Sequence, residues 1–120
     1  LVNHTKVSKP VASFPLLKHA SFAGGFCLTS LARFHCPNLK ILNLSFCVRL
    51  SERQIERLVD QSPLLERLIL VKCAGVASLD LESKSLRRLD ASFTHNMRDL
   101  RLACPALEQL DVSYLYGLLL

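Results

Sequence analysis

The stretch that decides the fold is CPNLKILNLSFC at residues 36–47, which is followed by SPLLERLILVKC at residues 62–73. Both contain a small residue, a proline, leucines at the same positions and a final cysteine. Self-similarity of this kind is the signature of repeat architectures. The pattern L-x-x-L-x-L-x-x-C, with looser last positions, has these copies: Leu39, Leu42, Leu44, Cys47; Leu65, Leu68, Leu70, Cys73; Leu86, Leu89, Ala91, Thr94; Leu107, Leu110, Val112, Leu115; and, more weakly, Leu17, Ala20, Phe22, Gly25.

The spacing of the copies predicts a solenoid. The repeats begin near residues 17, 39, 65, 86 and 107, so the steps are 22, 26, 21 and 21 residues, within the range of about 20 to 29 for leucine-rich repeats. The second and third leucines are two residues apart and therefore lie on one side of a strand. Parallel copies can bury them together. We predict one leucine-rich-repeat domain over residues 1–120: an α/β, right-handed solenoid of about five short coils with a parallel sheet on its concave face.

The returning half of each coil is expected to differ along the chain. SERQIERLVDQ has Ser51 and Gln54 at capping-box spacing, and its apolar residues recur at helical spacing, so we predict a helix over residues 51–61. A shorter helix is a candidate over 29–34. The 21-residue coils leave no room for a helix, so we predict short extended segments at 76–81 and 97–102.

The cysteines are expected to be structural. The chain has five, an odd number, with no C-x-x-C pair, which argues against a disulfide framework. The terminal Cys or Thr of each repeat falls where the strand turns away from the sheet, and there the loop backbone needs hydrogen-bond partners. Free cysteine suits a reducing compartment. We therefore expect an intracellular protein, cytoplasmic or nuclear.

The segment CPNLKILNLSFCVRLSERQIERLV resembles the cysteine-containing leucine-rich repeat, CxxLxxLxLxxCxxITDxxIxxL, which is typical of F-box/leucine-rich-repeat proteins. This resemblance implies a substrate-recognition region of an SCF-type ubiquitin ligase, in ubiquitin-dependent protein degradation. A protein substrate would bind to the repeats, and the ligase adaptor would bind to an F-box. The match is close over 36–73, partial over 74–115 and weak before residue 36.

The chain departs from that family pattern in three places. RLSERQ replaces the usual Ile-Thr-Asp, the last two repeats lack the corner cysteine, and no segment resembles an F-box. Because the sequence begins at Leu1 and ends in YGLLL, we expect a fragment of a longer chain. A leucine-rich-repeat scaffold or receptor module of another intracellular protein is the first alternative.

The binding residues are expected on the concave strand positions and at their edge. Ile41, Ile69 and Val71 would form an apolar patch, with Arg67 stacked on Arg88 and Asp90 on Asp111. Aromatic and arginine side chains often anchor protein interfaces. The predicted partner-binding residues are Ile41, Asn43, Phe46, Arg67, Ile69, Val71, Arg88, Asp90, Phe93, Gln109, Asp111 and Tyr114.

Charge distribution leaves a second alternative, a basic RNA-binding surface. Residues 1–51 contain six Lys and Arg and no Asp or Glu, whereas residues 61–120 contain seven of each sign. Nucleic-acid binding would need these cations on one surface with aromatic side chains for stacking. The aromatics available there, Phe14, Phe22, Phe26 and Phe34, have spacings that fit core positions, so nucleic acid is the less favoured partner.

Catalysis, metal binding and membrane insertion are not expected. The histidines His4, His19, His35 and His95 are scattered, with no HExxH arrangement and no metal-ligand spacing. No carboxylate pair or phosphate-binding glycine loop is present. No apolar run approaches the length of a membrane helix, about 18 residues or more. We therefore predict a non-catalytic protein without a cofactor or membrane partner.

Overall fold

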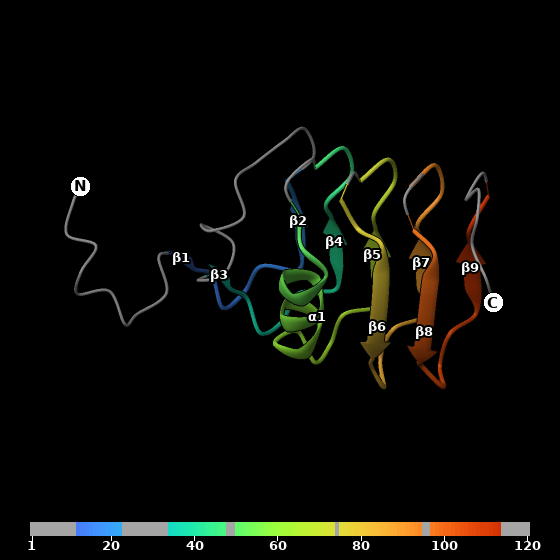
Figure 1. Cartoon of the computed structure of the whole chain (residues 1–120). Helices are drawn as coiled ribbons and strands as arrows, with labels where there is room; N and C mark the ends of the chain where they lie inside the picture. Colours follow the sequence, from blue (N-terminus) through green and yellow to red (C-terminus); the bar gives the residue numbers. More distant parts are fainter. Residues whose placement is uncertain (1–11, 23–33, 48–49, 74, 95–96, 114–120) are drawn as a thin grey trace, which may run out of the picture.

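The computed structural model describes residues 12–22, 34–47, 50–73, 75–94 and 97–113. Successive coils lie side by side along one axis (Figure 1). The described elements, in chain order, are β1 (Ala12–Ser13), β2 (His19–Ser21), β3 (Phe34–His35), β4 (Ile41–Asn43), α1 (Glu52–Asp60), β5 (Arg67–Ile69), β6 (Ser78–Glu82), β7 (Arg88–Asp90), β8 (Asp99–Ala103) and β9 (Gln109–Asp111).

The main sheet has one strand from each repeat. Its order is β2-β4-β5-β7-β9, and all neighbours are parallel. Each strand begins two residues after the first leucine of its repeat, so equivalent residues are in register across the whole sheet. This arrangement confirms the predicted leucine-rich-repeat solenoid. The register places in one central row Ala20, Leu42, Leu68, Leu89 and Leu110.

A column of leucines forms the core. Leu42, Leu68 and Leu89 are at most 1% exposed. From the opposite side of the coils, Leu79 and Leu81 of β6 complete the packing and are equally buried. The alternation of buried and exposed residues along β6 has the period of two that a strand requires.

Helix α1 forms where the sequence predicts it. Ser51 is the N-cap: its hydroxyl accepts the backbone N–H of Gln54, and the Gln54 side chain accepts the backbone N–H of Ser51. This capping box satisfies two of the backbone donors left open at a helix start. The helix buries Ile55, Leu58 and Val59 and is C-capped by Gln61.

The shorter coils return through strands rather than helices, as predicted. Strand β6 pairs in parallel with β8 over five residues, from Ser78 opposite Asp99 to Glu82 opposite Ala103. The second helix expected at 29–34 is not supported at its end, because Phe34 belongs to strand β3, which pairs with β1. Residues 29–33 lie outside the described part.

Two glutamates of α1 join the helical coil to the strand-return coils. A side-chain oxygen of Glu52 accepts the backbone N–H groups of Ala77 and Ser78 at 2.9 and 3.2 Å, and Glu56 accepts that of Asp80 at 3.0 Å. These donors belong to β6 and the residue before it. The helix therefore satisfies an edge of the β6–β8 sheet whose backbone groups would otherwise be unpaired.

The repeat-ending residues bind the preceding coil, as predicted for the corners. The Cys47 thiol donates to the carbonyl of Phe22, that of Cys73 to Leu44, and the Thr94 hydroxyl to Leu70. The distances from donor to carbonyl oxygen are 3.4, 3.0 and 2.9 Å. Since the acceptors are equivalent residues of successive coils, one hydrogen bond is repeated down the solenoid.

Candidate functional site

The exposed surface of the main sheet is formed by the first and third residues of its strands. We call it the ladder face; it corresponds to the predicted concave face. The first row is His19, Ile41, Arg67, Arg88 and Gln109, and the third row is Ser21, Asn43, Ile69, Asp90 and Asp111. These side chains point away from the leucine column because neighbouring strand residues alternate between the two sides of a sheet.

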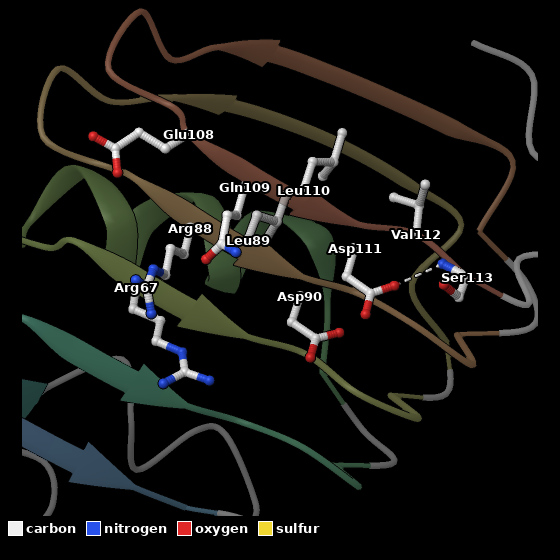
Figure 2. A pocket seen from close by; sticks show the side chains of 10 residues that line it. All are labelled: Arg67, Arg88, Leu89, Asp90, Glu108, Gln109, Leu110, Asp111, Val112 and Ser113. Atoms are coloured by element: carbon white, nitrogen blue, oxygen red, sulfur yellow. Dashed lines mark hydrogen bonds between the residues drawn. The ribbon is translucent and has the colours of Figure 1, made fainter.

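Two arginines stand next to each other in the first row. Arg67 and Arg88 are register partners on adjacent strands and both are exposed. Figure 2 shows their guanidinium groups together at one end of a depression on the ladder face. Neither guanidinium makes an ion pair or a hydrogen bond with the described part of the chain. The predicted arginine stack is therefore present, without a counter-ion among those residues.

The third row has a structural function as well as an exposed position. The side-chain oxygens of Asn43, Asp90 and Asp111 each accept the backbone N–H of a serine two residues later, at 3.0, 3.1 and 3.0 Å. These contacts are Asx turns, which end a strand by replacing a backbone partner. The hydrogen bond from the Ser113 N–H lowers the pKa of Asp111 because it stabilises the charged form.

The edge of the ladder face has a column of aromatic and cationic side chains. Phe46, Lys72 and Phe93 follow the strands and have φ values of 64°, 57° and 60°, in the left-handed region. The Lys72 Nζ lies 5.7 Å from the ring centroid of Phe46 and 5.6 Å from that of Phe93. Both are cation–π distances. Tyr114, the fourth predicted edge residue, lies outside the described residues.

The apolar residues predicted to form a patch are arranged diagonally. Ile41 is the register partner of Arg67, and Ile69 is the partner of Asn43. Ile41 and Ile69 therefore occupy different rows of adjacent strands, and Val71 lies two residues beyond Ile69. All three side chains are half-buried. The surface they form is smaller and more interrupted by polar groups than a straight stack would be.

A shallow, open depression of about 780 Å³ crosses the C-terminal half of the ladder face (Figure 2). Arg67, Arg88 and Glu108 lie toward one end of the depression, and Asp90 and Asp111 lie further along the strands (Figure 2). The repeat alignment predicted both the arginine pair and the aspartate pair, which the register confirms. The lining residues are Arg67, Arg88, Leu89, Asp90, Glu108, Gln109, Leu110, Asp111, Val112 and Ser113.

A row of alternating charges borders the ladder face just before the strands begin. Lys40, Glu66, Arg87 and Glu108 occupy equivalent positions of four repeats. Arg87 contacts Glu108 at 2.6 Å, and the Lys40 Nζ is 3.9 Å from a Glu66 oxygen. Sequence reasoning missed this row, although the alternation of sign at the residue before each strand was a usable signal.

The predicted basic RNA-binding surface gains no support from the described residues. Of the six cations in residues 1–51, two are described: Lys18 and Lys40. Lys40 is paired with Glu66. Phe14, expected in the core, is 50% exposed, so that expectation was wrong. The other four cations of residues 1–51 lie outside the described part, as does Cys27.

The Cys73 thiol and the placement of His, Cys, Asp and Glu side chains bear on the chemistry available to the described residues. Burial raises the pKa of the Cys73 thiol to about 11, which keeps it protonated at neutral pH and unsuited to nucleophilic attack. The described residues contain no cluster of three His, Cys, Asp or Glu side chains that could hold a metal ion. Among the same residues, α1 is too short and too polar to cross a bilayer.

The parallel ladder, the leucine column and the inter-coil corner bonds define the class: the protein is a leucine-rich-repeat solenoid with an exposed ladder face. Comparison with known families then gives a particular assignment. The chain belongs to the family described as FBD-associated F-box protein At5g56370, LRR repeats, and the match covers residues 2–116. No curated protein and no solved structure matches the chain significantly. Repeats of this kind are protein-interaction modules.

Proposed function

We propose that this chain is a non-catalytic module that holds a protein substrate on its ladder face for an SCF-type, F-box-containing ubiquitin ligase. The observation that carries the proposal is the repeat family, which is defined by F-box proteins and matches residues 2–116. In such a ligase the repeats would select the substrate, and an F-box elsewhere in the parent chain would bind the adaptor. The setting would be cytoplasmic or nuclear.

The surface of the solenoid supports a protein partner. The ladder face combines half-buried aliphatic residues with arginines and an aromatic edge, and the last two are residue types enriched at protein interfaces. The sheet under it is rigid, because each strand is hydrogen-bonded to its neighbours and Leu42, Leu68 and Leu89 of the central row are at most 1% exposed. A rigid face with protruding anchors loses little conformational entropy when a partner binds.

The test compares two faces of the same molecule. A photo-reactive benzoyl-phenylalanine would replace Val71 on the ladder face or, as the control, Arg57 on the exposed side of α1. The 120-residue chain with each probe would be expressed in cells and irradiated. We expect specific proteins to be captured from position 71 and not from position 57.

The ligase function needs a second measurement on the captured proteins. Overproduced repeats should compete with the intact ligase, so the ubiquitin conjugates of its substrates should decrease and their half-lives should lengthen. Equal capture from both positions would contradict the binding face. If proteins are captured from position 71 but their ubiquitination does not change, the chain is still a protein-interaction module. The ligase function would then be wrong, and a scaffold of another kind would be favoured.

A further inference from the structure

We infer that the occupant of the ladder face is an extended protein segment that places a carboxylate between Arg67 and Arg88 and apolar side chains over Ile69 and Val71. This inference rests on the proposed protein-binding function and specifies the chemistry of the partner. It begins from an imbalance of charge: two arginines are register partners on adjacent strands, although like charges in register repel each other.

The carboxylates near the arginines are directed at other groups. Glu108 contacts Arg87 at 2.6 Å, and Glu66 lies 3.9 Å from Lys40. Asp90 accepts hydrogen bonds from the backbone N–H and the hydroxyl of Ser92. From Lys40 to Glu108 the residues before the strands thus alternate in sign and form ion pairs, although Lys18 before β2 is a second cation beside Lys40. In the next row, Arg67 and Arg88 are both positive and form no ion pair within the described part of the chain.

The position of the two arginines fits one carboxylate. Neighbouring strands of a sheet are about 4.8 Å apart, so the guanidinium groups of Arg67 and Arg88 can converge on the same anion. Figure 2 shows both groups at the same end of the depression, open to solvent. Arginine matches a carboxylate with two parallel N–H···O bonds, which makes the contact directional as well as charged.

The apolar part of the occupant follows from the period of strand β5 and its extension. Arg67 and Ile69 are two residues apart and face the same side of β5, and the half-buried Val71 follows two residues later, in the turn after the strand. An extended segment lying along this strand has the same period of about 6.6 Å per two residues. A glutamate at one position therefore brings the second and fourth residues after it, or before it, over Ile69 and Val71.

The probes are two capped peptides, Gly-Glu-Ser-Leu-Ser-Leu-Gly and its reverse Gly-Leu-Ser-Leu-Ser-Glu-Gly, which cover both chain directions. Each has a partner with glutamine in place of glutamate, and a third version carries phosphoserine there. Binding to the 120-residue chain is followed by ¹H–¹⁵N spectra, including the arginine Nε–Hε signals. We expect one glutamate peptide to shift the Arg67 and Arg88 signals and its glutamine version to bind about tenfold more weakly.

Substitution of one arginine separates recognition from folding. Arg88→Glu places opposite charges in register, so the melting temperature should stay the same or rise, whereas the affinity for the glutamate peptide should fall about tenfold or more. Arg53→Glu, on the exposed surface of α1, makes the same change in net charge away from the ladder face and should leave the affinity unchanged.

Three results would overturn the inference. They are equal binding of the glutamate and glutamine peptides, binding of the phosphoserine version with no binding of either glutamate peptide, and no binding at all. Equal loss of affinity in Arg53→Glu and Arg88→Glu would also overturn it, because the effect would then come from net charge. The cross-linking test at position 71 does not require that a carboxylate binds to Arg88. If the peptide test fails, the proposed protein-binding function can therefore still be correct.

Discussion

The Cys73 thiol donates a hydrogen bond to the main-chain carbonyl of Leu44, one coil earlier, with 3.0 Å between sulfur and oxygen. The thiol is buried, and burial raises its pKa to about 11, so the donor stays protonated over the range in which the protein would work. The cysteine at the end of the repeat is thus a linker between coils and not a reactive group.

Replacing this linker should weaken the stack. Cys73→Ala removes the donor and leaves a small void, so we expect the free energy of unfolding to fall by about 1 to 3 kcal/mol. Cys104→Ala is the comparison, because the half-buried Cys104 thiol donates a longer hydrogen bond, 3.8 Å, to the Leu81 carbonyl and its loss should cost less. Urea denaturation of both variants measures the difference, and an equal loss would contradict the linking function.

The leucine column can be tested with two leucines that are close in sequence. Leu68 is fully buried and Leu64 is 45% exposed. Leu68→Ala should lower the free energy of unfolding by about 2 to 5 kcal/mol, as truncation in a packed core does. Leu64→Ala should change it by less than about 0.5 kcal/mol. If the two variants denature alike, the assignment of Leu68 to the central row is wrong.

The carboxylate of Glu52 should make stability depend on pH. The backbone N–H of Ala77 is the largest cause that lowers the pKa of Glu52, and the N–H of Ser78 adds to it. Because the folded pKa lies below the unfolded one, the stabilisation is fully present above the ordinary value of 4.5 and is lost as the pH falls through the folded pKa.

Unfolding free energies of the parent chain and of Glu52→Gln, measured between acid and neutral pH, check this expectation. Near neutral pH the variant should be less stable by about 1 kcal/mol, a modest amount because the site is partly open to solvent. The difference should shrink toward zero in acid. Glu82→Gln, at an exposed glutamate of β6, is the control. A difference that persists at low pH would show that the carboxylate charge is not involved.

The positive charge of Lys72 between the rings of Phe46 and Phe93 should stabilise the fold. Lys72→Gln removes the charge that lies over Phe46 and Phe93 and should lower the free energy of unfolding by about 0.5 to 1 kcal/mol. Lys72→Arg keeps the charge and should keep most of the stability. Thermal melts compare the two, and NMR shifts of the Lys72 side chain report its position over the rings. If Lys72→Gln and Lys72→Arg have the same melting temperature, the cation–π contacts of Lys72 do not contribute to stability.

The leucine spacing was enough to predict the sheet, its register and the buried row, because burial of a repeated apolar pattern has few solutions. Leu42, Leu68 and Leu89 occupy the expected positions. The helix expected at 29–34 was harder to judge from sequence. Phe34, which the structure places in strand β3, has no alternating pattern around it to separate a strand from a short helix. Local pattern alone does not decide such short segments.

The candidate site was predictable in its residues but not in their contacts. Stacking of Arg67 on Arg88 followed from the repeat alignment. The Asx turns at Asn43, Asp90 and Asp111 depend on the backbone direction at the strand exit, which the leucine pattern does not determine. The same geometry places Lys72 in the left-handed region and against its aromatic neighbours.

The glutamate contacts between α1 and β6 also determine where the solenoid is modular. A tandem duplication of residues 86–106 would add a coil of the type that already surrounds it, with strands ready to pair on both sides. An insertion between α1 and β6 would separate Glu52 and Glu56 from Ala77, Ser78 and Asp80 and leave their charges and donors unmatched. Lengthened versions of this protein should therefore tolerate added coils after β6 and be destabilised by an insertion between α1 and β6.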